Sequence, residues 1–395
     1  MRFIHTADWQ LGAGFTGRTR PDDLRSARLE SVAGLLEVAA KERVDFTVVA
    51  GDIFESNRVS RRLLYDVKEV LRKAACPVYI LPGNHDPLSE DSLYSVRDEW
   101  RELPGNVQIL KERAPVQVGE ATLYPCPCVG KVSSKDPTGW IPPRSGRDGI
   151  RIGVAHGSWL VLPDVSLDDH PVEPRAAGTR SLDYLALGHW HSTFPDTTQV
   201  AGRTFYSGTH EPTAFGERDS GNVLLVSIGA PGALPDVEKR RIGRFSWLQV
   251  EKEISDPGSL AALRREFESI PGPESTLVRA AIKGAVRIEV RSELARLADE
   301  MAYRFFSFEC DTSGVSVAVT GSDVSALPSP LLRQVSERLR SCAQGESTAL
   351  PPDWSFGPKY AKGSTGAAAT VLSGVAERAL ELLFSRVPRQ GGARQ

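Results

Sequence analysis

The chain begins with RFIHTADWQLG at residues 2–12, an apolar, strand-like run that ends in polar side chains. Asp8 and Gln10 lie two residues apart, so strand geometry continued to this point would turn both side chains to the same side. A carboxylate and an amide at a strand end either hold a metal ion or close a turn. The other strand ends of the chain decide between these two interpretations.

The segments that follow alternate between helical and extended patterns. Residues 26–44 and 61–74 carry apolar side chains at helical spacing, whereas residues 45–50 and 77–81 are short apolar or β-branched runs. This alternation indicates a layered α/β domain. Further strands are predicted at 107–110, 115–118, 121–125, 150–155, 184–187, 204–206 and 222–228. The Pro-, Gly- and Asp-rich stretches between some of these strands, 163–180 among them, predict surface loops.

The pattern changes near residue 245. A strand, a helix, a strand and a helix follow, and residues 305–311 and 315–321 then predict two closing strands of a small α+β module. Two further helical stretches are predicted at 329–343 and 368–384. A length of 395 residues agrees with two or three domains. We therefore predict a first domain at 1–245, an α+β domain at 246–325 and a C-terminal helical region at 326–395.

Composition describes a globular protein without an overall charge bias. Apolar residues make up 41% of the chain, and 48 Lys and Arg balance 50 Asp and Glu, so only a local basic groove could favour nucleic acid. No apolar run reaches the roughly 18 residues of a membrane span, and Asp8 interrupts any signal-peptide core. The five cysteines are scattered and odd in number, which predicts reduced thiols in a cytoplasmic protein.

Carboxylate, amide and imidazole side chains follow several of the predicted strands. In layered α/β folds, such side chains gather at the carboxyl ends of the strands. Each alone could cap a turn, but together they favour a metal centre. Imidazoles with carboxylates suit Mn, Fe, Zn or Co better than Ca or Mg, and a shared carboxylate can bridge two ions roughly 3.5–4 Å apart. The set comprises Asp8, Gln10, Asp52, Asn84, His85, His156, His189 and His191.

The ordered motifs GD, GNHD, HG and GHWH after the initial Asp8 resemble the calcineurin-like metallophosphoesterase superfamily. HTADWQLG, GDIFE and YSGTHEPTAFGE more narrowly resemble its DNA-repair exonuclease branch, which includes the SbcD-type nuclease subunit of the SbcCD complex. The resemblance covers residues 1–230 through motifs and 246–320 through general layout. It implies an α/β fold, namely a four-layer sandwich of two β-sheets flanked by helices, with a small α+β capping domain and C-terminal helices.

The resemblance also assigns roles to these positions. It implies two divalent ions, Mn²⁺ in this family, and in-line attack of water on a DNA phosphodiester. One ion would be held by Asp8, Gln10, Asp52 and His191. The other would be held by Asp52, Asn84, His156 and His189, so that Asp52 bridges the pair. His85, helped by Asp86, would act near the leaving oxygen as a general acid or transition-state stabiliser.

Gln10 departs from the family pattern, which has a histidine there. A neutral carbonyl ligand is weaker than imidazole for a transition metal. Three outcomes follow from this difference: weak or water-mediated ligation by Gln10, loss of one metal with residual activity, or loss of catalysis.

Three other side chains have two interpretations each. Arg58 and Arg61 could contact DNA phosphates or belong to a solvated helix start. His210 could contact nucleic acid or close a loop. His5, inside the first strand, is predicted to be a packed core residue, and His170 a surface residue of its loop.

The predicted function is a Mn²⁺-dependent DNA exonuclease or endonuclease in repair or processing. The C-terminal helices would dock an SbcC-type SMC-like ATPase or pack on the chain itself, and a homodimer is possible. Two other functions remain open. One is a phosphoesterase acting on nucleotides or phosphoproteins, and the other is a DNA-binding scaffold whose metal site is impaired at Gln10.

Overall fold

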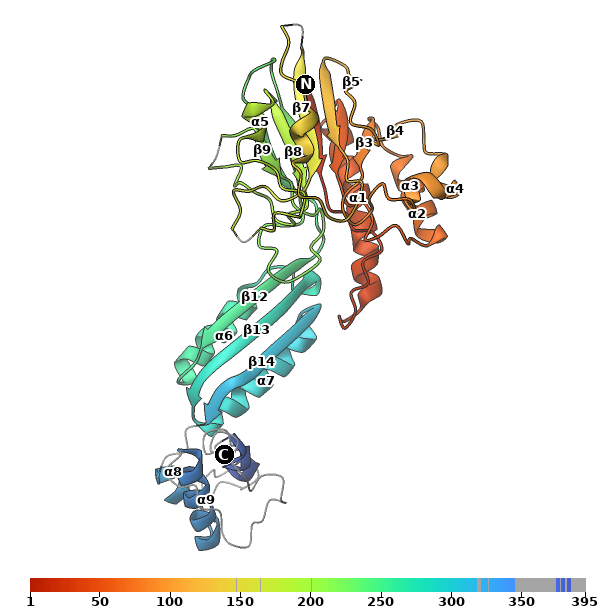
Figure 1. The fold of residues 1–395 in the computed structure, drawn as a ribbon. Coiled ribbons are helices and arrows are strands. Elements are labelled where there is room, and N and C mark those ends of the chain that lie inside the picture. The colour runs from red at the N-terminus through yellow and green to blue at the C-terminus, as the bar shows by residue number, and fades with distance from the viewer. Residues whose placement is uncertain are drawn as a thin grey trace, which may run out of the picture. The chain divides into compact units, whose positions relative to one another are not determined.

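The structure is a computed structural model that describes residues 1–146, 148–163, 165–199, 201–317, 321–325, 327–344, 374–376, 378–380 and 382–384 (Figure 1). The chain divides into two compact units, Met1–Trp247 and Leu248–Gln395. The predicted separation of residues 246–325 from 326–395 stays a prediction, since much of the last region lies outside the described residues.

The first unit contains a six-stranded sheet in the order β11-β10-β1-β2-β3-β4. Strands β1 to β4 run parallel, and β10 and β11 are added antiparallel at one edge. The strands are β1 (Arg2–Thr6), β2 (Phe46–Ala50), β3 (Val78–Leu81), β4 (Val107–Ile109), β10 (Asn222–Ser227) and β11 (Asp236–Arg241). Strands β1, β2 and β3 coincide with the apolar runs that precede the predicted ligands.

A five-stranded sheet in the order β5-β6-β7-β8-β9 lies against the first. Its last four strands are parallel, and β5 pairs antiparallel with β6. The strands are β5 (Val116–Val118), β6 (Ala121–Cys126), β7 (Ile150–His156), β8 (Tyr184–Gly188) and β9 (Thr204–Tyr206).

Large apolar side chains fill the space between the two sheets. Phe3 of β1 and Phe46 of β2 stack at 4.8 Å between ring centroids, and Tyr184 of β8 meets Phe3 edge-on. Alternation along β1 turns Phe3 inward, whereas Ile4 points to the opposite, helix-covered face. His5 also points inward, where its ring bonds the Tyr184 hydroxyl at 2.9 Å and the carbonyl of Leu187 at 3.1 Å. The prediction that His5 is a packed core residue is confirmed.

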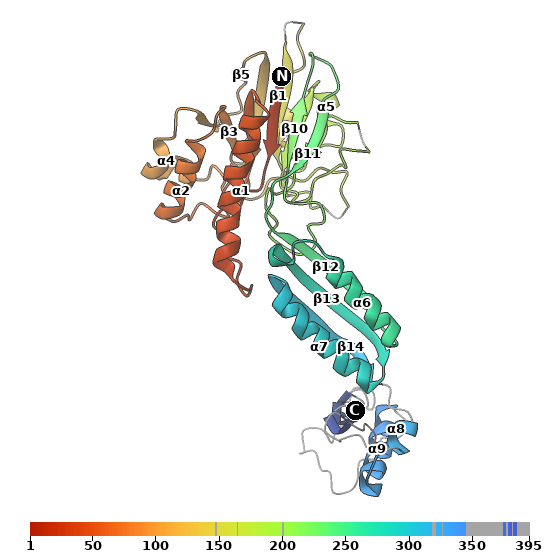
Figure 2. The same ribbon diagram turned by 180° about the vertical axis from the view of Figure 1, so that it is seen from behind.

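Helices cover the outer face of the six-stranded sheet. Helix α1 (Pro21–Lys41) and helix α2 (Arg61–Leu71) bury apolar faces against it (Figure 2). Ser60 caps α2 by accepting a hydrogen bond from the Leu63 amide at 3.2 Å. Short elements and loops cover the other sheet. The elements on that sheet are η1 (Pro137–Trp140) and α5 (Ala176–Thr179), whereas α3 (Leu93–Val96) and α4 (Asp98–Arg101) pack with α2 on the six-stranded sheet. The predicted fold class, two sheets flanked by helices, is confirmed.

The second unit contains a three-stranded sheet in the order β12-β13-β14 with two helices side by side on one face (Figures 1 and 2). Its elements are β12 (Ser246–Glu253), α6 (Pro257–Ser269), η2 (Pro273–Ser275), β13 (Thr276–Val286), α7 (Ile288–Arg304) and β14 (Ser307–Val317). The prediction of two separate closing strands is wrong, because β14 continues without a break from Ser307 through Val317, across the expected gap at 312–314. Residues 318–320 of the second predicted strand lie outside the described residues, and α8 begins at Gly321. Strand β13 pairs in parallel with β14 from Leu277 to Val286, and the register shifts between Ala281 and Lys283, as in a β-bulge.

Helices α8 (Gly321–Ser325) and α9 (Pro330–Ala343) follow. Of the predicted helix at 368–384, the described residues 374–376, 378–380 and 382–384 are helical. All five cysteines are described, and each carries a free thiol. Within the described part of the chain, none of the helices combines the length and apolar character needed to cross a membrane.

Candidate metal centre

The strands of both sheets deliver the predicted ligands to one place. Asp8 and Asp52 follow β1 and β2, His156 ends β7, and His189 follows β8. Two hydrogen bonds join the sheets here: His156 Nδ1 lies 2.9 Å from the Ala50 carbonyl, and the His189 amide donates to the Asp8 carboxylate at 3.0 Å. Within the six-stranded sheet, the Asp8 amide donates to the Gly51 carbonyl at 3.1 Å, and the Gln10 amide to the Asp52 carbonyl at 2.9 Å. The carboxyl ends of the two sheets therefore meet at one place.

Close approach at this place requires glycine. A Cβ on Gly51 would lie 2.1 Å from His156 Nδ1, and a Cβ on Gly83 would lie 2.1 Å from Asp52 Oδ1. Gly51 also has a positive φ of 95°. These two positions let the polar side chains approach across the backbone without a steric clash.

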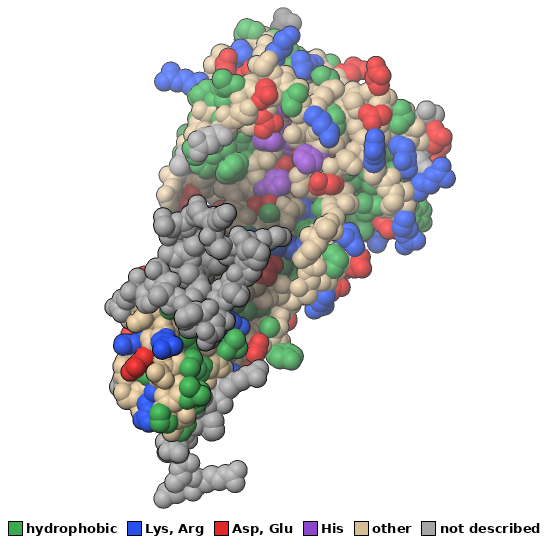
Figure 3. Space-filling view, turned by 60° about the horizontal axis from the view of Figure 1, so that its bottom comes forward, with side chains coloured by type: hydrophobic (Ala, Val, Ile, Leu, Met, Phe, Trp, Pro, Cys, Tyr) green, Lys and Arg blue, Asp and Glu red, His purple; other side chains and the backbone are tan. Residues whose placement is uncertain are grey.

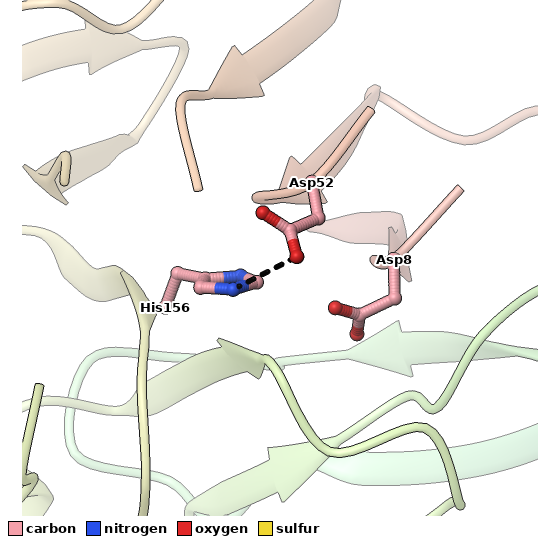
Figure 4. Close-up of side chains that lie close together, drawn as sticks. All are labelled: Asp8, Asp52 and His156. Carbon is pink, nitrogen blue, oxygen red and sulfur yellow. Dashed lines mark ion pairs between the residues drawn. The ribbon is translucent and has the colours of Figure 1, made fainter. Parts of the chain in front are cut away.

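Asp8, Asp52 and His156 form the centre of the site (Figure 4). One ligand atom from each lies within 4.8 Å of the others, and each residue is at most 1% exposed. His156 Nε2 lies 3.4 Å from Asp52 Oδ2. Two buried carboxylates and an imidazole that converge in this way form a donor set suited to a divalent transition metal.

Burial and mutual attraction set the charges of this group. Burial raises the pKa of Asp8. Burial also opposes ionisation of Asp52 and His156, but their mutual attraction dominates: it lowers the pKa of Asp52 to about 2 and raises that of His156 to about 10. Without a metal, the His156 imidazolium thus supplies the positive charge that the buried carboxylates need.

Several of these residues have left-handed backbone conformations. The φ angles are 53° at Asp8, 38° at Gln10, 54° at Asp52 and 102° at His189. Strand geometry therefore ends before Asp8, and tight turns rather than strand alternation direct the two side chains that opened the sequence. Non-glycine residues in this region are sparse and cluster at functional sites.

Asn84 and His156 meet directly. His156 Nδ1 lies 2.9 Å from the Ala50 carbonyl, which can only accept, so Nδ1 carries a proton. Nε2 then faces Asn84 Oδ1 at 2.9 Å. Gln10 is 6% exposed and lies in the same loop as Asp8.

The remaining two histidines lie next to the centre, each paired with a carboxylate. The His189 amide donates to the Asp8 carboxylate at 3.0 Å, and its ring is 5.4 Å from the His156 ring. His189 Nε2 lies 2.7 Å from Asp169, and His191 Nδ1 lies 2.7 Å from Glu217. Asp169 and Glu217 were missed from the sequence. Glu217 ends the quoted YSGTHEPTAFGE motif, which was the available signal, whereas Asp169 lies in a segment predicted to be surface loop.

His85 lies at the edge of this centre with 40% of its side chain exposed. Its amide donates to Asp52 Oδ1 at 2.9 Å, and its Nδ1 lies 3.0 Å from the Glu55 carbonyl. Figure 3 shows histidine and acidic side chains together on one face of the first unit.

Asp86 has a different environment from the one expected. Its buried carboxylate accepts bonds from the Gly83 amide, the Phe54 amide and the Tyr94 hydroxyl at 2.8, 3.0 and 2.7 Å. Burial, with the nearby Asp52 charge, raises its pKa to about 6. These bonds fix the turn that carries His85, so the structure gives Asp86 an indirect relation to that imidazole.

The three residues predicted to contact DNA are in different environments. Arg58 and Arg61 are exposed. Arg58 lines a pocket of about 350 Å³ together with Arg25, Arg62 and Glu55. His210 is fully buried, bonds the carbonyl of Arg28 at 2.8 Å and leaves no surface for DNA. The alternative interpretation, that His210 closes a loop, agrees with these contacts.

His170 is a correction. It was predicted to lie at the surface but is 4% exposed, and its Nε2 lies 3.1 Å from the Gly130 carbonyl. A Cβ on Gly157 would lie 2.1 Å from the His170 carbonyl oxygen, so the loop packs tightly behind the metal centre.

Comparison with known proteins relates the first part of the chain to a protein family. The calcineurin-like phosphoesterase family matches residues 1–193. This segment is a calcineurin-like phosphoesterase domain. The phosphoesterase domain contains β1 to β8 and every predicted metal ligand, and β9, β10 and β11 of the two sheets follow it.

Three curated relatives extend the likeness. The chain is 35% identical over 125 residues to the uncharacterized metallophosphoesterase YhaO of Bacillus subtilis, covering 29% of each chain. It is 28% identical over 212 residues to the SbcD component of the SbcCD nuclease of Escherichia coli, covering 53% of this chain and 51% of the relative. It is 25% identical over 283 residues to the DNA double-strand break repair protein Mre11 of Aeropyrum pernix, covering 66% and 65%. The matches thus span less than two thirds of the length of each relative.

Proposed function

We propose that this protein is a Mn²⁺-dependent DNA nuclease, acting as an exonuclease or endonuclease in DNA repair or processing. The observation that carries the proposal is the buried convergence of Asp8, Asp52 and His156 at the joined ends of two sheets. Similarity to proteins named as nuclease and break-repair components supports DNA as the substrate.

The donor set fits two divalent ions. Asp8, Gln10 and His191 would complete one site and Asn84, His156 and His189 the other, with Asp52 shared. Asp52 Oδ2 already faces His156 while Oδ1 accepts the His85 amide, so its carboxylate is held in a fixed orientation. Metal ions bound there would supply a nucleophilic water and charge stabilisation for phosphoryl transfer.

His85 is the residue proposed to act on the leaving oxygen. Its ring is exposed enough to meet a substrate, and the Glu55 carbonyl 3.0 Å from Nδ1 leaves Nε2 turned away from that contact. The turn that carries it is fixed by the three bonds to the Asp86 carboxylate. His85 would therefore donate a proton, or a hydrogen bond, to the leaving oxygen.

DNA phosphates would meet the pocket beside Glu55. Arg25, Arg58 and Arg62 line this pocket, although Arg62 also bonds Asp66 at 3.0 Å. Arg58 is the exposed cation nearest in sequence to Glu55. Glu55 lines the pocket, and its carbonyl oxygen lies 3.0 Å from His85 Nδ1. Phosphate contacts of this kind fix the register of a strand rather than its sequence.

We also propose that the C-terminal helices dock an SbcC-type SMC-like ATPase in the cytoplasm, with a homodimer as a possible assembly. Leu331 at the start of α9 is 67% exposed and offers an apolar contact. A Leu331→Glu variant should lose co-purification with the ATPase while keeping nuclease activity, and unchanged co-purification would contradict this docking site.

One assay tests the nuclease proposal. The protein is incubated with Mn²⁺ and linear, hairpin or single-stranded DNA, beside a small phosphodiester ester, with His85→Ala and Asp52→Asn variants as controls. DNA cleavage that both variants lose is expected. Cleavage of the small ester alone would indicate a small-substrate phosphoesterase, and DNA retention without cleavage would indicate a binding scaffold; either result overturns the proposal.

A further inference from the structure

Two carboxylates outside the predicted ligand set each hold a candidate ligand. Asp169 Oδ2 lies 2.7 Å from His189 Nε2, and Glu217 Oε1 lies 2.7 Å from His191 Nδ1. We propose that Asp169 and Glu217 are positioning residues that decide which ring nitrogen each histidine presents to the metal centre. This inference rests on the proposed function, since it takes His189 and His191 as metal ligands.

Hydrogen-bond chemistry gives the assignment. An ionised carboxylate only accepts, so the ring nitrogen bonded to it carries the proton, and the other nitrogen has the free lone pair. His189 therefore presents Nδ1 and His191 presents Nε2. Metal-ligating histidines commonly donate their second N–H to a carboxylate or a carbonyl, and that partner fixes the ring orientation.

His156 provides an internal comparison. Its Nδ1 is held by the neutral Ala50 carbonyl at 2.9 Å, which leaves Nε2 facing Asn84 and Asp52. Each of the three rings thus has one nitrogen held by an acceptor, and this nitrogen is Nε2 in His189 but Nδ1 in His156 and His191. Its φ of 102° and the bond from its amide to Asp8 belong to the same distorted turn.

The two carboxylates are held in place to different degrees. Glu217 has 11% of its side chain exposed and accepts bonds from the amide of Thr213 at 2.7 Å and from the Thr213 hydroxyl. Asp169 has 29% exposed and accepts a longer bond, 3.2 Å, from Ser158. Solvent screens the more exposed carboxylate, so Glu217 should influence its histidine more strongly.

Glu217 also affects the metal site that would contain Gln10, the residue that departs from the family pattern. Gln10 gives its predicted site a neutral, weak ligand, and His191 is the imidazole of that same site. A carboxylate bonded to the far side of an imidazole raises its basicity as a ligand. Glu217 therefore offsets part of the affinity that Gln10 costs.

Metal titration separates these roles. Metal-free wild type, Glu217→Gln and Asp169→Asn are titrated with Mn²⁺ and with Zn²⁺ by calorimetry, and no nuclease assay is needed. The carboxamides keep the side-chain shape but remove the charge. We expect Glu217→Gln to weaken one metal equivalent by about 10- to 100-fold and Asp169→Asn to weaken the other by less. Glu217→Asp, which keeps the charge, should recover part of the loss and also serves if Glu217→Gln fails to fold.

Asp183→Asn is the matched control. Asp183 is 1% exposed and bonds Arg144 at 2.6 Å and the Arg151 amide at 2.9 Å. This substitution should lower thermal stability but leave metal affinity unchanged, which distinguishes positioning from general destabilisation.

Nitrogen spectra supply the second readout. In Zn²⁺-loaded protein with ¹⁵N-labelled histidine, we expect His189 to be bound through Nδ1, and His156 and His191 through Nε2. Binding of His189 through Nε2, or wild-type affinity in both carboxamide variants, would overturn the positioning role while leaving the metal centre intact. Failure of the wild type to bind metal would overturn the proposed function and this inference together.

Discussion

The floor of the centre, Asp8, Asp52 and His156, differs sharply from its rim, His85 and Arg58. Floor residues are at most 1% exposed and lie at the strand ends of two sheets, which the bond between His156 Nδ1 and the Ala50 carbonyl connects. On the rim, the His85 side chain is 40% exposed, and Arg58 is exposed on a loop. The comparison teaches that one site can combine fixed charges, suited to holding ions, with accessible groups suited to meeting a substrate.

The largest expected effect is loss of the floor's shared ligand. Asp52→Asn removes the one carboxylate proposed to bridge two ions, so Mn²⁺ binding and DNA cleavage should both disappear. Calorimetry and a cleavage assay on the same preparation check this. If the variant bound as many metal ions as the wild type, Asp52 would not be a shared ligand, and the proposed difference between floor and rim would be wrong.

A rim substitution should act on rate alone. His85→Ala is expected to lower the cleavage rate by about 10²- to 10⁴-fold, the usual contribution of an acid or base side chain. Metal affinity should stay at the wild-type value, because the ring contacts the Glu55 carbonyl rather than the floor side chains. A parallel fall in metal affinity would place His85 among the ligands.

Two floor residues, His156 and Asp52, should make the stability of the metal-free protein depend on pH. His156 has its pKa raised from 6.5 to about 10, so its stabilising contribution is complete below pH 6.5 and is lost as pH rises toward 10. Asp52 has its pKa lowered from 3.8 to about 2, so its contribution is complete above pH 3.8 and is lost below it.

Thermal unfolding of metal-free wild type should therefore shift to lower temperature between pH 6.5 and 10. His156→Gln should be less stable at neutral pH and should flatten this dependence. Parallel curves for the two proteins would show that other groups control stability in this range.

Gln10 is buried like the floor residues, but its neutral carbonyl would bind a transition metal more weakly than an imidazole. Gln10→His should raise the Mn²⁺ affinity of one equivalent by roughly tenfold, or about 1.4 kcal/mol, with cleavage kept or increased. Calorimetry on the variant and wild type measures this. Unchanged affinity and stoichiometry would mean that position 10 is not a ligand.

The smallest effect is expected at Arg58. Arg58→Ala should weaken DNA binding a few-fold and reduce the slope of log affinity against log salt by about 1, with metal affinity and the rate at saturating DNA unchanged. Lys135→Ala, at an exposed lysine of another loop, is the control. An unchanged salt slope would argue against a phosphate contact.

The convergence of the floor residues could be predicted from the sequence because each of them follows a recognisable strand. The apolar runs before Asp8, Asp52 and His156 form β1, β2 and β7, and parallel strands bring their carboxyl ends together. The fold class follows from the same alternation of strands and helices, which needs only local periodicity.

What sequence reasoning missed depends on contacts between distant segments. Asp169 and His170 lie in a polar, proline-rich stretch whose composition indicates surface. Asp169 bonds His189, and His170 contacts the carbonyl of Gly130. The local sequence cannot specify such contacts. His210 shows the same limit, since its burial comes from packing on Trp9 and a bond to Arg28.

The joining of two sheets at the centre has a thermodynamic consequence. Because Asp8 and Asp52 extend from one sheet, and His156 and His189 from the other, an ion bound by both sets would cross-link the two layers of the sandwich. Binding to the folded state alone stabilises it by RT ln(1 + [L]/Kd), about 2.7 kcal/mol when free metal is about 100-fold above Kd. Separating the sheets would release the ion, so metal supply would control the stability of the folded domain as well as whether it can act.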